Sequence, residues 1–118
     1  MVTNISITER TKSFAIRIVK AGCFLDEKPG IYRTLSKQLL RSGTSIGANC
    51  REAQSAQSDK DFINKLEIAL KEARETQYWL EILIESELVD KQRFQLLLQE
   101  ANEIGKILVT STKKLKGK

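Results

Sequence analysis

Apolar residues recur every three or four positions along four stretches of the chain, which is the spacing of one buried face of an α-helix. The pattern predicts four helices, over residues 6–26, 29–56, 58–87 and 90–112. A basic tail that frays follows them at residues 113–118. Four amphipathic helices with short connections predict an all-α fold. We expect an antiparallel up-down-up-down four-helix bundle that occupies residues 1–118 as a single domain.

The predicted helices begin at residues that commonly cap or open a helix. Ser6 and Glu9 have the spacing of a capping box, in which each side chain satisfies a free backbone N–H of the other residue. Pro29 suits the first position of the second helix, because a first-turn residue would leave its backbone N–H unpaired. Ser58 and Asp90 are favourable N-cap residues for the third and fourth helices.

The middle of the second helix is unusually small and polar. The apolar residues of its buried face are Leu35, Leu39, Ile46 and Ala53. Gly43 and Gly47 each cost about 1 kcal/mol relative to alanine inside a helix, a cost that a chain accepts where a neighbouring backbone comes close. Ser42 and Asn49 share the buried face, so we expect them to form a structural polar core. The alternative is an ordinary core helix with incidental small residues.

Composition favours one helical domain inside the cell. The chain has 118 residues, of which 30% are charged and 6% aromatic. The first ten residues lack the apolar run of a signal peptide, and no segment has the roughly 18 apolar residues of a membrane span. We therefore expect a cytoplasmic protein without membrane contact, in which Cys23 and Cys50 are free thiols.

The sequence offers little for catalysis. It contains no histidine, which removes the commonest general base and the commonest metal ligand. Glu72 and Glu75 resemble a carboxylate pair, but salt bridges explain them better. Cys50 is next to Arg51, which could favour a reactive thiol. Because the chain offers no base to activate this thiol, a packed and unreactive side chain is the better interpretation. We expect no enzyme activity, no catalytic residue, no bound metal and no cofactor.

Charge is distributed unevenly between the second and third helices. Residues 31–57 hold four basic side chains and one acidic one, whereas residues 58–90 hold four basic and nine acidic ones. The basic row of the second helix consists of Arg33, Lys37, Arg41 and Arg51. This row is suited to a phosphate backbone. The alternative is a solvated face that pairs with the acidic third helix.

Two further apolar stripes lie off the core faces. The stripe on the first helix is Ile16, Val19 and Cys23, and the stripe on the third is Ile68, Trp79 and Ile82. Such stripes are too apolar for the surface of a monomer, and tryptophan is enriched at subunit interfaces. We expect both stripes to form an oligomer interface. Insertion of Trp79 into the core by rotation of the helix is the alternative.

A specific set of residues runs along the second and third predicted helices, namely Gln38 to Asn49, Glu52-Ala53, Ser58, Asp61-Phe62, Lys65-Leu66, Ile68-Ala69 and Lys71 to Leu80. Through these residues the chain resembles the 23S rRNA intervening-sequence protein family, and the similarity extends from about residue 8 to residue 112. The resemblance implies a small bacterial four-helix bundle that assembles into a homopentamer. Related proteins act with diversity-generating retroelements, where they bind nucleic acid and a reverse transcriptase. The family has no established catalytic residues. Position 43 is often alanine in the family and is glycine here.

The favoured prediction is a homo-oligomeric, non-enzymatic bundle that binds nucleic acid, RNA in preference to DNA, through its basic surface. The predicted partners are other copies of the chain, RNA or DNA, and a reverse transcriptase or other protein. The alternative function is a scaffold that binds only proteins.

Overall fold

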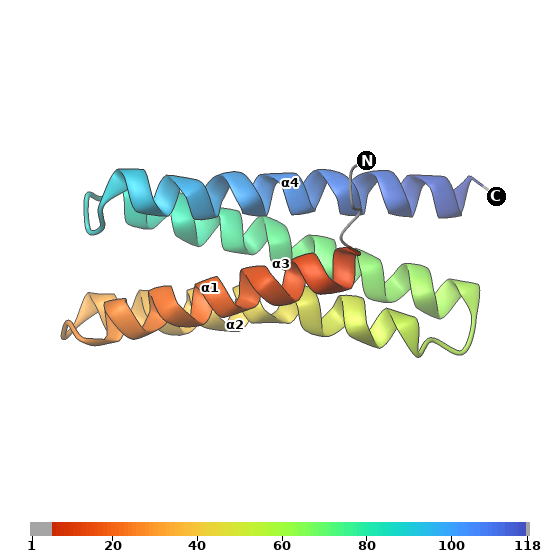
Figure 1. The fold of residues 1–118 in the computed structure, drawn as a ribbon, viewed down its shortest axis with the longest axis horizontal. Coiled ribbons are helices and arrows are strands. Elements are labelled where there is room, and N and C mark those ends of the chain that lie inside the picture. The colour runs from red at the N-terminus through yellow and green to blue at the C-terminus, as the bar shows by residue number, and fades with distance from the viewer. Residues whose placement is uncertain (1–5, 118) are drawn as a thin grey trace.

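The computed structural model describes residues 6–117, which contain four α-helices. They are α1 (Ile7–Asp26), α2 (Ile31–Gln54), α3 (Asp59–Glu85) and α4 (Lys91–Lys116). Consecutive helices run in opposite directions (Figure 1), so the predicted all-α up-down-up-down bundle is confirmed. The outermost residues of the predicted domain, 1–5 and 118, lie outside the described part of the chain. No helix between residues 6 and 117 combines the length and apolar character that a membrane crossing requires.

Side-chain hydrogen bonds explain where two of the helices, α1 and α3, begin. The Ser6 hydroxyl accepts from the backbone N–H of Glu9 at 3.1 Å, and the Ser58 hydroxyl accepts from that of Asp61 at 3.0 Å. Pro29 does not open α2 as expected. The preceding turn places Gly30 at φ 76°, a left-handed conformation that favours glycine, and the helix begins only at Ile31.

The predicted fraying tail is instead the last turn of α4, which continues to Lys116. Thr112 is buried and Leu115 packs against the core, so apolar contact continues past residue 112. Lys116 also forms an ion pair with Glu67 of α3. Cationic side chains in the last turn further favour the helix because they face the negative end of its dipole. Sequence periodicity alone therefore ended the helix one turn too early.

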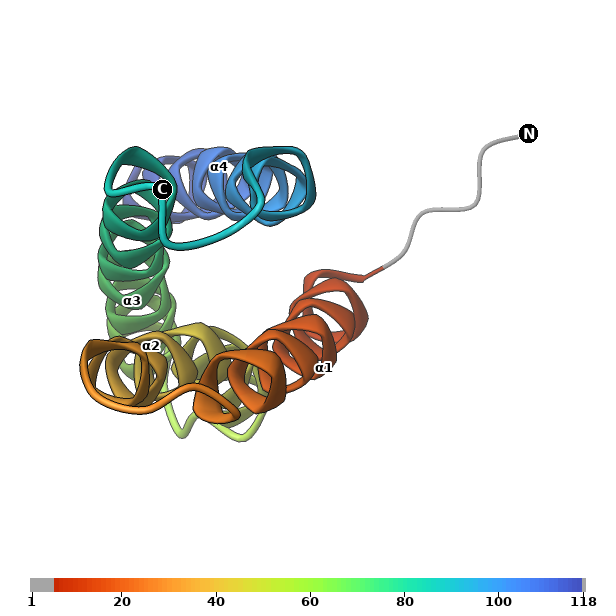
Figure 2. The same cartoon turned by 90° about the vertical axis from the view of Figure 1, so that its left-hand side faces the viewer.

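The core lies along the shared inner faces of the four helices. Its largest fully buried apolar side chains are Phe14, Ile18, Leu25, Leu39, Ile46, Leu80, Leu83, Ile104 and Leu108. The helix pairs α1–α2, α2–α3 and α3–α4 pack closely, whereas α1 and α4 share few contacts. Viewed end-on, the helices form a C that opens between α1 and α4 (Figure 2). Two hollows lined by residues of α1 and α4 lie on this side of the bundle, which we call the groove.

Close approach of α1 to α2 accounts for the glycines in the middle of α2. A Cβ atom at Gly43 would lie 2.8 Å from Cγ2 of Ile18, and one at Gly47 would lie 3.2 Å from the backbone oxygen of Thr11. Further along the same contact, the Ser36 hydroxyl donates to the backbone oxygen of Gly22 at 3.2 Å. The two helix backbones thus come close along several turns, as the small residues indicated.

The two residues expected in the polar core have different environments. Ser42 is fully buried, and its hydroxyl lies 3.0 Å from that of Thr76 on α3. Asn49 is only half-buried, and its side-chain N–H donates to the Ser45 carbonyl of its own helix at 2.9 Å. The buried arc of α2 extends toward Gly43 and Cys50, which leaves Asn49 at its edge. The prediction of a buried core position for Asn49 is therefore corrected.

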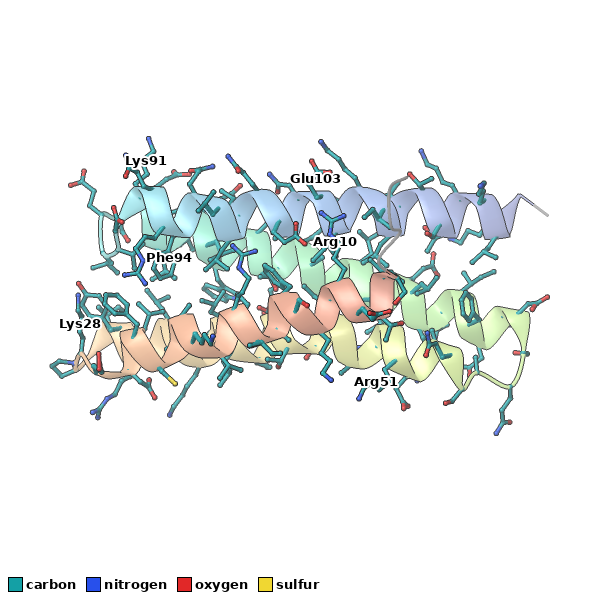
Figure 3. All side chains as sticks on the ribbon, viewed as in Figure 1. Arg10, Lys28, Arg51, Lys91, Phe94 and Glu103 are labelled. Carbon is teal, nitrogen blue, oxygen red and sulfur yellow. The ribbon has the colours of Figure 1, made fainter. Side chains whose placement is uncertain are left out.

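An ion pair spans the groove between α1 and α4. The Arg10 guanidinium extends toward α4 (Figure 3), where Nε and Nη2 donate to the two Glu100 carboxylate oxygens at 2.7 and 2.8 Å. Two hollows flank this pair. One, of about 210 Å³, lies between the end of α1 and the start of α4, and the other, of about 580 Å³, lies at the opposite end of the groove.

Hydrogen bonds from Arg10 lower the pKa of Glu100, and partial burial opposes this only in part. A carboxylate whose pKa is lower in the folded than in the unfolded state stabilises the fold at pH values above its unfolded-state pKa. This stabilisation is lost as the pH falls through the folded-state pKa. We expect Glu100→Gln to lower the free energy of unfolding at pH 7 by about 1–2 kcal/mol, a range reduced for partial exposure.

Urea denaturation at pH 7 and at pH 3 measures this effect. The gap between wild type and Glu100→Gln should shrink at pH 3, because acid protonates the carboxylate. Glu103→Gln is the matched control, since Glu103 is exposed and only its more distant charge acts on Arg10. Equal stability of wild type and Glu100→Gln at pH 7 would show that the pair does not hold α1 against α4.

Candidate nucleic-acid interface

Three of the four predicted basic residues lie on the outer surface of α2. Arg33, Lys37 and Arg51 are exposed, and no ion pair within residues 6–117 involves any of them. The Arg33 Nε atom donates to the backbone oxygen of Asp26 at 3.4 Å, which positions it beside the end of α1. Fourteen residues separate Lys37 from Arg51, so about 21 Å of helix lies between these cations. The basic row is therefore interrupted.

Arg41 belongs to a different environment. Its guanidinium faces α3, where it forms ion pairs with Glu75 and, at 3.4 Å, with Glu72. The indole N–H of Trp79 donates to the same Glu75 carboxylate at 3.0 Å. The alternative interpretation, a basic side chain paired with the acidic third helix, thus describes Arg41. Its charge is largely balanced by carboxylates of the same chain.

Further cations, which the sequence pattern did not single out, lie in the groove. Arg17 and Lys20 of α1 and Arg93 of α4 line the hollow of about 210 Å³, together with the aromatic ring of Phe24. Arg17 and Lys20 are three residues apart, so they share a helix face, but Arg93 is distant in sequence. Only the antiparallel pairing of α1 with α4 brings these charges together.

The predicted apolar stripe on α1 is exposed. Ile16 and Val19 retain 49% and 45% of their accessible surface, and Cys23 is exposed beside them. Leu40 of α2 is 39% exposed. It lies at the same level of the bundle as Val19, because two contacts between α1 and α2 bracket this pair. These contacts join Gly22 with Ser36 and Ile18 with Gly43. We call Ile16, Val19, Cys23 and Leu40 the α1–α2 patch. It is the kind of contiguous apolar surface that marks an interaction site.

The stripe predicted on α3 is less accessible. Ile68, Trp79 and Ile82 are all half-buried, and Trp79 and Ile82 pack against the core of the bundle. The exposed ring of Tyr78 makes an edge contact with Trp79 at a centroid distance of 5.2 Å. Trp79 lies beside Glu75, which pairs with Arg41, so this stripe lies on the α2–α3 side of the bundle, whereas the α1–α2 patch lies along the contact between α1 and α2. A Trp79 substitution would disturb the fold as well as any interface.

The groups considered for catalysis are occupied or inaccessible. Glu72 and Glu75 both pair with Arg41. Cys50 is buried, and this burial raises the pKa of its thiol, so the thiol stays protonated near neutral pH. Across residues 6–117, no three His, Cys, Asp or Glu side chains gather in an arrangement that suits a metal ion. The surface features that remain are cationic groups and the α1–α2 patch.

The fold and surface define a small helical bundle with unpaired cations and an exposed apolar face. The chain belongs to the 23S rRNA-intervening sequence protein family, whose model matches residues 3–110. It is also similar to a crystal structure from Bacteroides thetaiotaomicron, described as a protein of unknown function from the S23 ribosomal protein family. That similarity has 48% sequence identity and a TM-score of 0.84, and covers 92% of this chain and 99% of that one. No curated protein matches the chain.

Proposed function

We propose that this protein is a self-associating, non-enzymatic bundle that binds nucleic acid, RNA in preference to DNA, in the cytoplasm. The observation that carries the proposal is the set of exposed cations on α2 without ion-pair partners among residues 6–117, namely Arg33, Lys37 and Arg51. Cations free of internal partners bind phosphates and release the counterions that the phosphates had condensed. The family name, which refers to 23S rRNA, supports RNA as the nucleic acid.

Self-association strengthens this proposal. A single subunit offers only three such cations on α2, with Arg51 distant from Arg33 and Lys37, whereas a symmetric ring repeats them in every copy. The resemblance described above implies five copies. The α1–α2 patch is the surface that we assign to subunit contacts, with Ile68, Trp79 and Ile82 as the opposing surface. Repetition of a weak phosphate contact raises the overall avidity without any new contact.

The second candidate function is a scaffold that binds only proteins, a reverse transcriptase among them. The observation that favours it is the α1–α2 patch, whose apolar side chains suit a protein partner as well as a second copy. The two functions differ in their dependence on salt, because apolar contacts do not release counterions.

The nucleic-acid function predicts a salt-dependent interaction that changes with the α2 cations. The triple variant Arg33→Gln, Lys37→Gln, Arg51→Gln should weaken RNA binding about tenfold or more at low salt. Its slope of log affinity against log salt should flatten by about 2, since each phosphate contact to a single strand contributes about 0.7. Fluorescence anisotropy of a labelled single-stranded RNA at two salt concentrations measures both quantities.

Arg41→Gln is the matched control, because the carboxylates of α3 already pair with this cation. It should change RNA affinity less than any single replacement in the triple variant. Failure of wild type to retain structured RNA, single-stranded RNA or duplex DNA at low salt would favour the protein scaffold.

A further inference from the structure

The groove between α1 and α4 contains a small hollow in which cations surround an apolar floor. The floor consists of Ala21 from α1 and Phe94 and Leu97 from α4, all of which are buried. Arg17, Lys20 and Arg93 stand around it and are exposed. We call this set the basic hollow. Its volume of about 210 Å³ falls below the roughly 300–1,000 Å³ of sites that enclose a whole drug-sized ligand.

The aromatic ring of Phe24 holds the edge of the basic hollow in place. The Arg93 Cζ atom lies 5.7 Å from the centroid of this ring, and the Lys28 Nζ atom lies 4.9 Å from it. Lys28 also lies 4.9 Å from the Tyr32 ring centroid, and Lys28 and Phe94 lie at the same end of the bundle (Figure 3). Cation–π contacts restrain the two cations without neutralising them.

No carboxylate forms an ion pair with these cations in the described part of the chain. The ion pairs among residues 6–117 use Arg10, Arg41 and Lys116 as their cations, and none uses Arg17, Lys20, Lys28 or Arg93. Glu100 lies close to Arg17, but both of its oxygens already accept hydrogen bonds from Arg10. Four cations from α1, α4 and the turn after α1 thus repel one another, and a bound anion would relieve this repulsion.

We propose that the basic hollow is a phosphate-binding site. The forked donors of Arg17 and Arg93 match the geometry of phosphate oxygens, and Lys20 adds a point charge. A phosphate has enough acceptor oxygens for all three groups, whereas one carboxylate would leave donors unsatisfied. The volume suits a phosphate and part of an attached sugar, not a whole nucleotide. The phosphate belongs to a nucleic-acid strand, which rests on the proposed function, or to a small phosphorylated molecule.

The turn between α1 and α2 connects this site with the α2 surface. Lys28 contacts the aromatic rings on both sides of the turn, and Arg33 reaches back to the Asp26 carbonyl at the end of α1. Basic side chains therefore extend from the basic hollow to the start of α2, with the exposed Asp26 and Glu27 in the same turn. A nucleic-acid strand seated in the basic hollow would reach Arg33 without leaving the surface.

The test compares Arg17→Gln/Arg93→Gln with the control variant Lys12→Gln/Lys106→Gln. The control removes two exposed cations from the same two helices but outside the basic hollow. The probes are sodium pyrophosphate, a single-stranded RNA oligonucleotide and polyglutamate. Nuclear magnetic resonance follows the Arg17 and Arg93 Nε signals and the Phe24 ring signals, and calorimetry gives affinities. Circular dichroism verifies that each variant remains folded.

We expect pyrophosphate and RNA to shift the Arg17, Arg93 and Phe24 signals. The Arg17→Gln/Arg93→Gln variant should bind both probes about tenfold or more weakly, since it loses two charge-assisted contacts, and the control variant should bind like wild type. Shifts with pyrophosphate but no RNA binding would support the site with a small phosphorylated ligand and refute the nucleic-acid function.

Three results would overturn the proposal. In the first, neither RNA nor pyrophosphate moves these signals, and RNA binding is weakened only by the α2 triple variant, which leaves the nucleic-acid function intact. In the second, neither phosphate probe binds. In the third, polyglutamate binds at the basic hollow more tightly than pyrophosphate, which identifies an acidic protein as the partner.

Discussion

Gly43→Ala should destabilise the bundle by about 1–3 kcal/mol relative to Gly105→Ala, the range observed for overpacked cores. Both glycines lie inside helices, so both substitutions gain the same helix propensity, about 1 kcal/mol. A Cβ atom at Gly43 would lie 2.8 and 2.9 Å from the two γ-carbons of Ile18, whereas one at Gly105 meets no atom within 4 Å. Ile18 is fully buried and β-branched, so it has little freedom to move away.

Urea denaturation of the two variants gives this difference directly. Gly105→Ala should be as stable as wild type or more stable, because it gains propensity without a clash. The double variant Gly43→Ala/Ile18→Ala should lose less stability than the two single variants together, since alanine at position 18 removes both γ-carbons that the new methyl group meets. Additive losses would show that Ile18 is not the obstacle and that α1 and α2 can separate slightly.

Periodicity predicts most of the bundle because the period itself determines which side of each helix is buried. The buried Leu35, Leu39, Ile46 and Ala53 of α2 all follow from this rule. The Ser58 cap of α3 follows from a different signal, the preference for serine at the N-cap. Periodicity could not separate Ser42 from Asn49. Both fall within one predicted face, but the true centre of that face depends on how α1 and α3 pack against α2.

The candidate interface was less predictable for the same physical reason. Arg41 shares a basic row with Arg33 and Lys37 in the sequence, yet its position on the helix turns it toward Glu72 and Glu75 of α3. The basic hollow depends on the distance between α1 and α4. The hydrophobic pattern of a single helix does not determine its distance from another helix. Neighbouring helices decide which cations remain unpaired.

Val19→Asp should lower the oligomeric state of the protein. Val19 lies within the α1–α2 patch, where Ile16 and Leu40 are also exposed. A carboxylate at this position would be desolvated in every subunit contact, without a cation nearby in the patch to pair with it. Loss of an apolar interface anchor costs about 2 kcal/mol or more, which corresponds to about a thirtyfold weaker association at each contact. Light scattering after size-exclusion chromatography measures the mass of each species.

Leu96→Asp is the matched control for this substitution. Leu96 is 58% exposed, more than Val19, but it lies on α4 and outside the α1–α2 patch. The same charge placed there should leave the oligomer unchanged, so that a difference between the variants reports the patch and not general surface apolarity. If wild type remains monomeric at tens of micromolar, or if the two variants have equal mass, the α1–α2 patch does not join copies of the chain. The patch would then contact a different partner. The protein-scaffold function would then explain why these apolar side chains face solvent, since neither the core nor a second copy covers them.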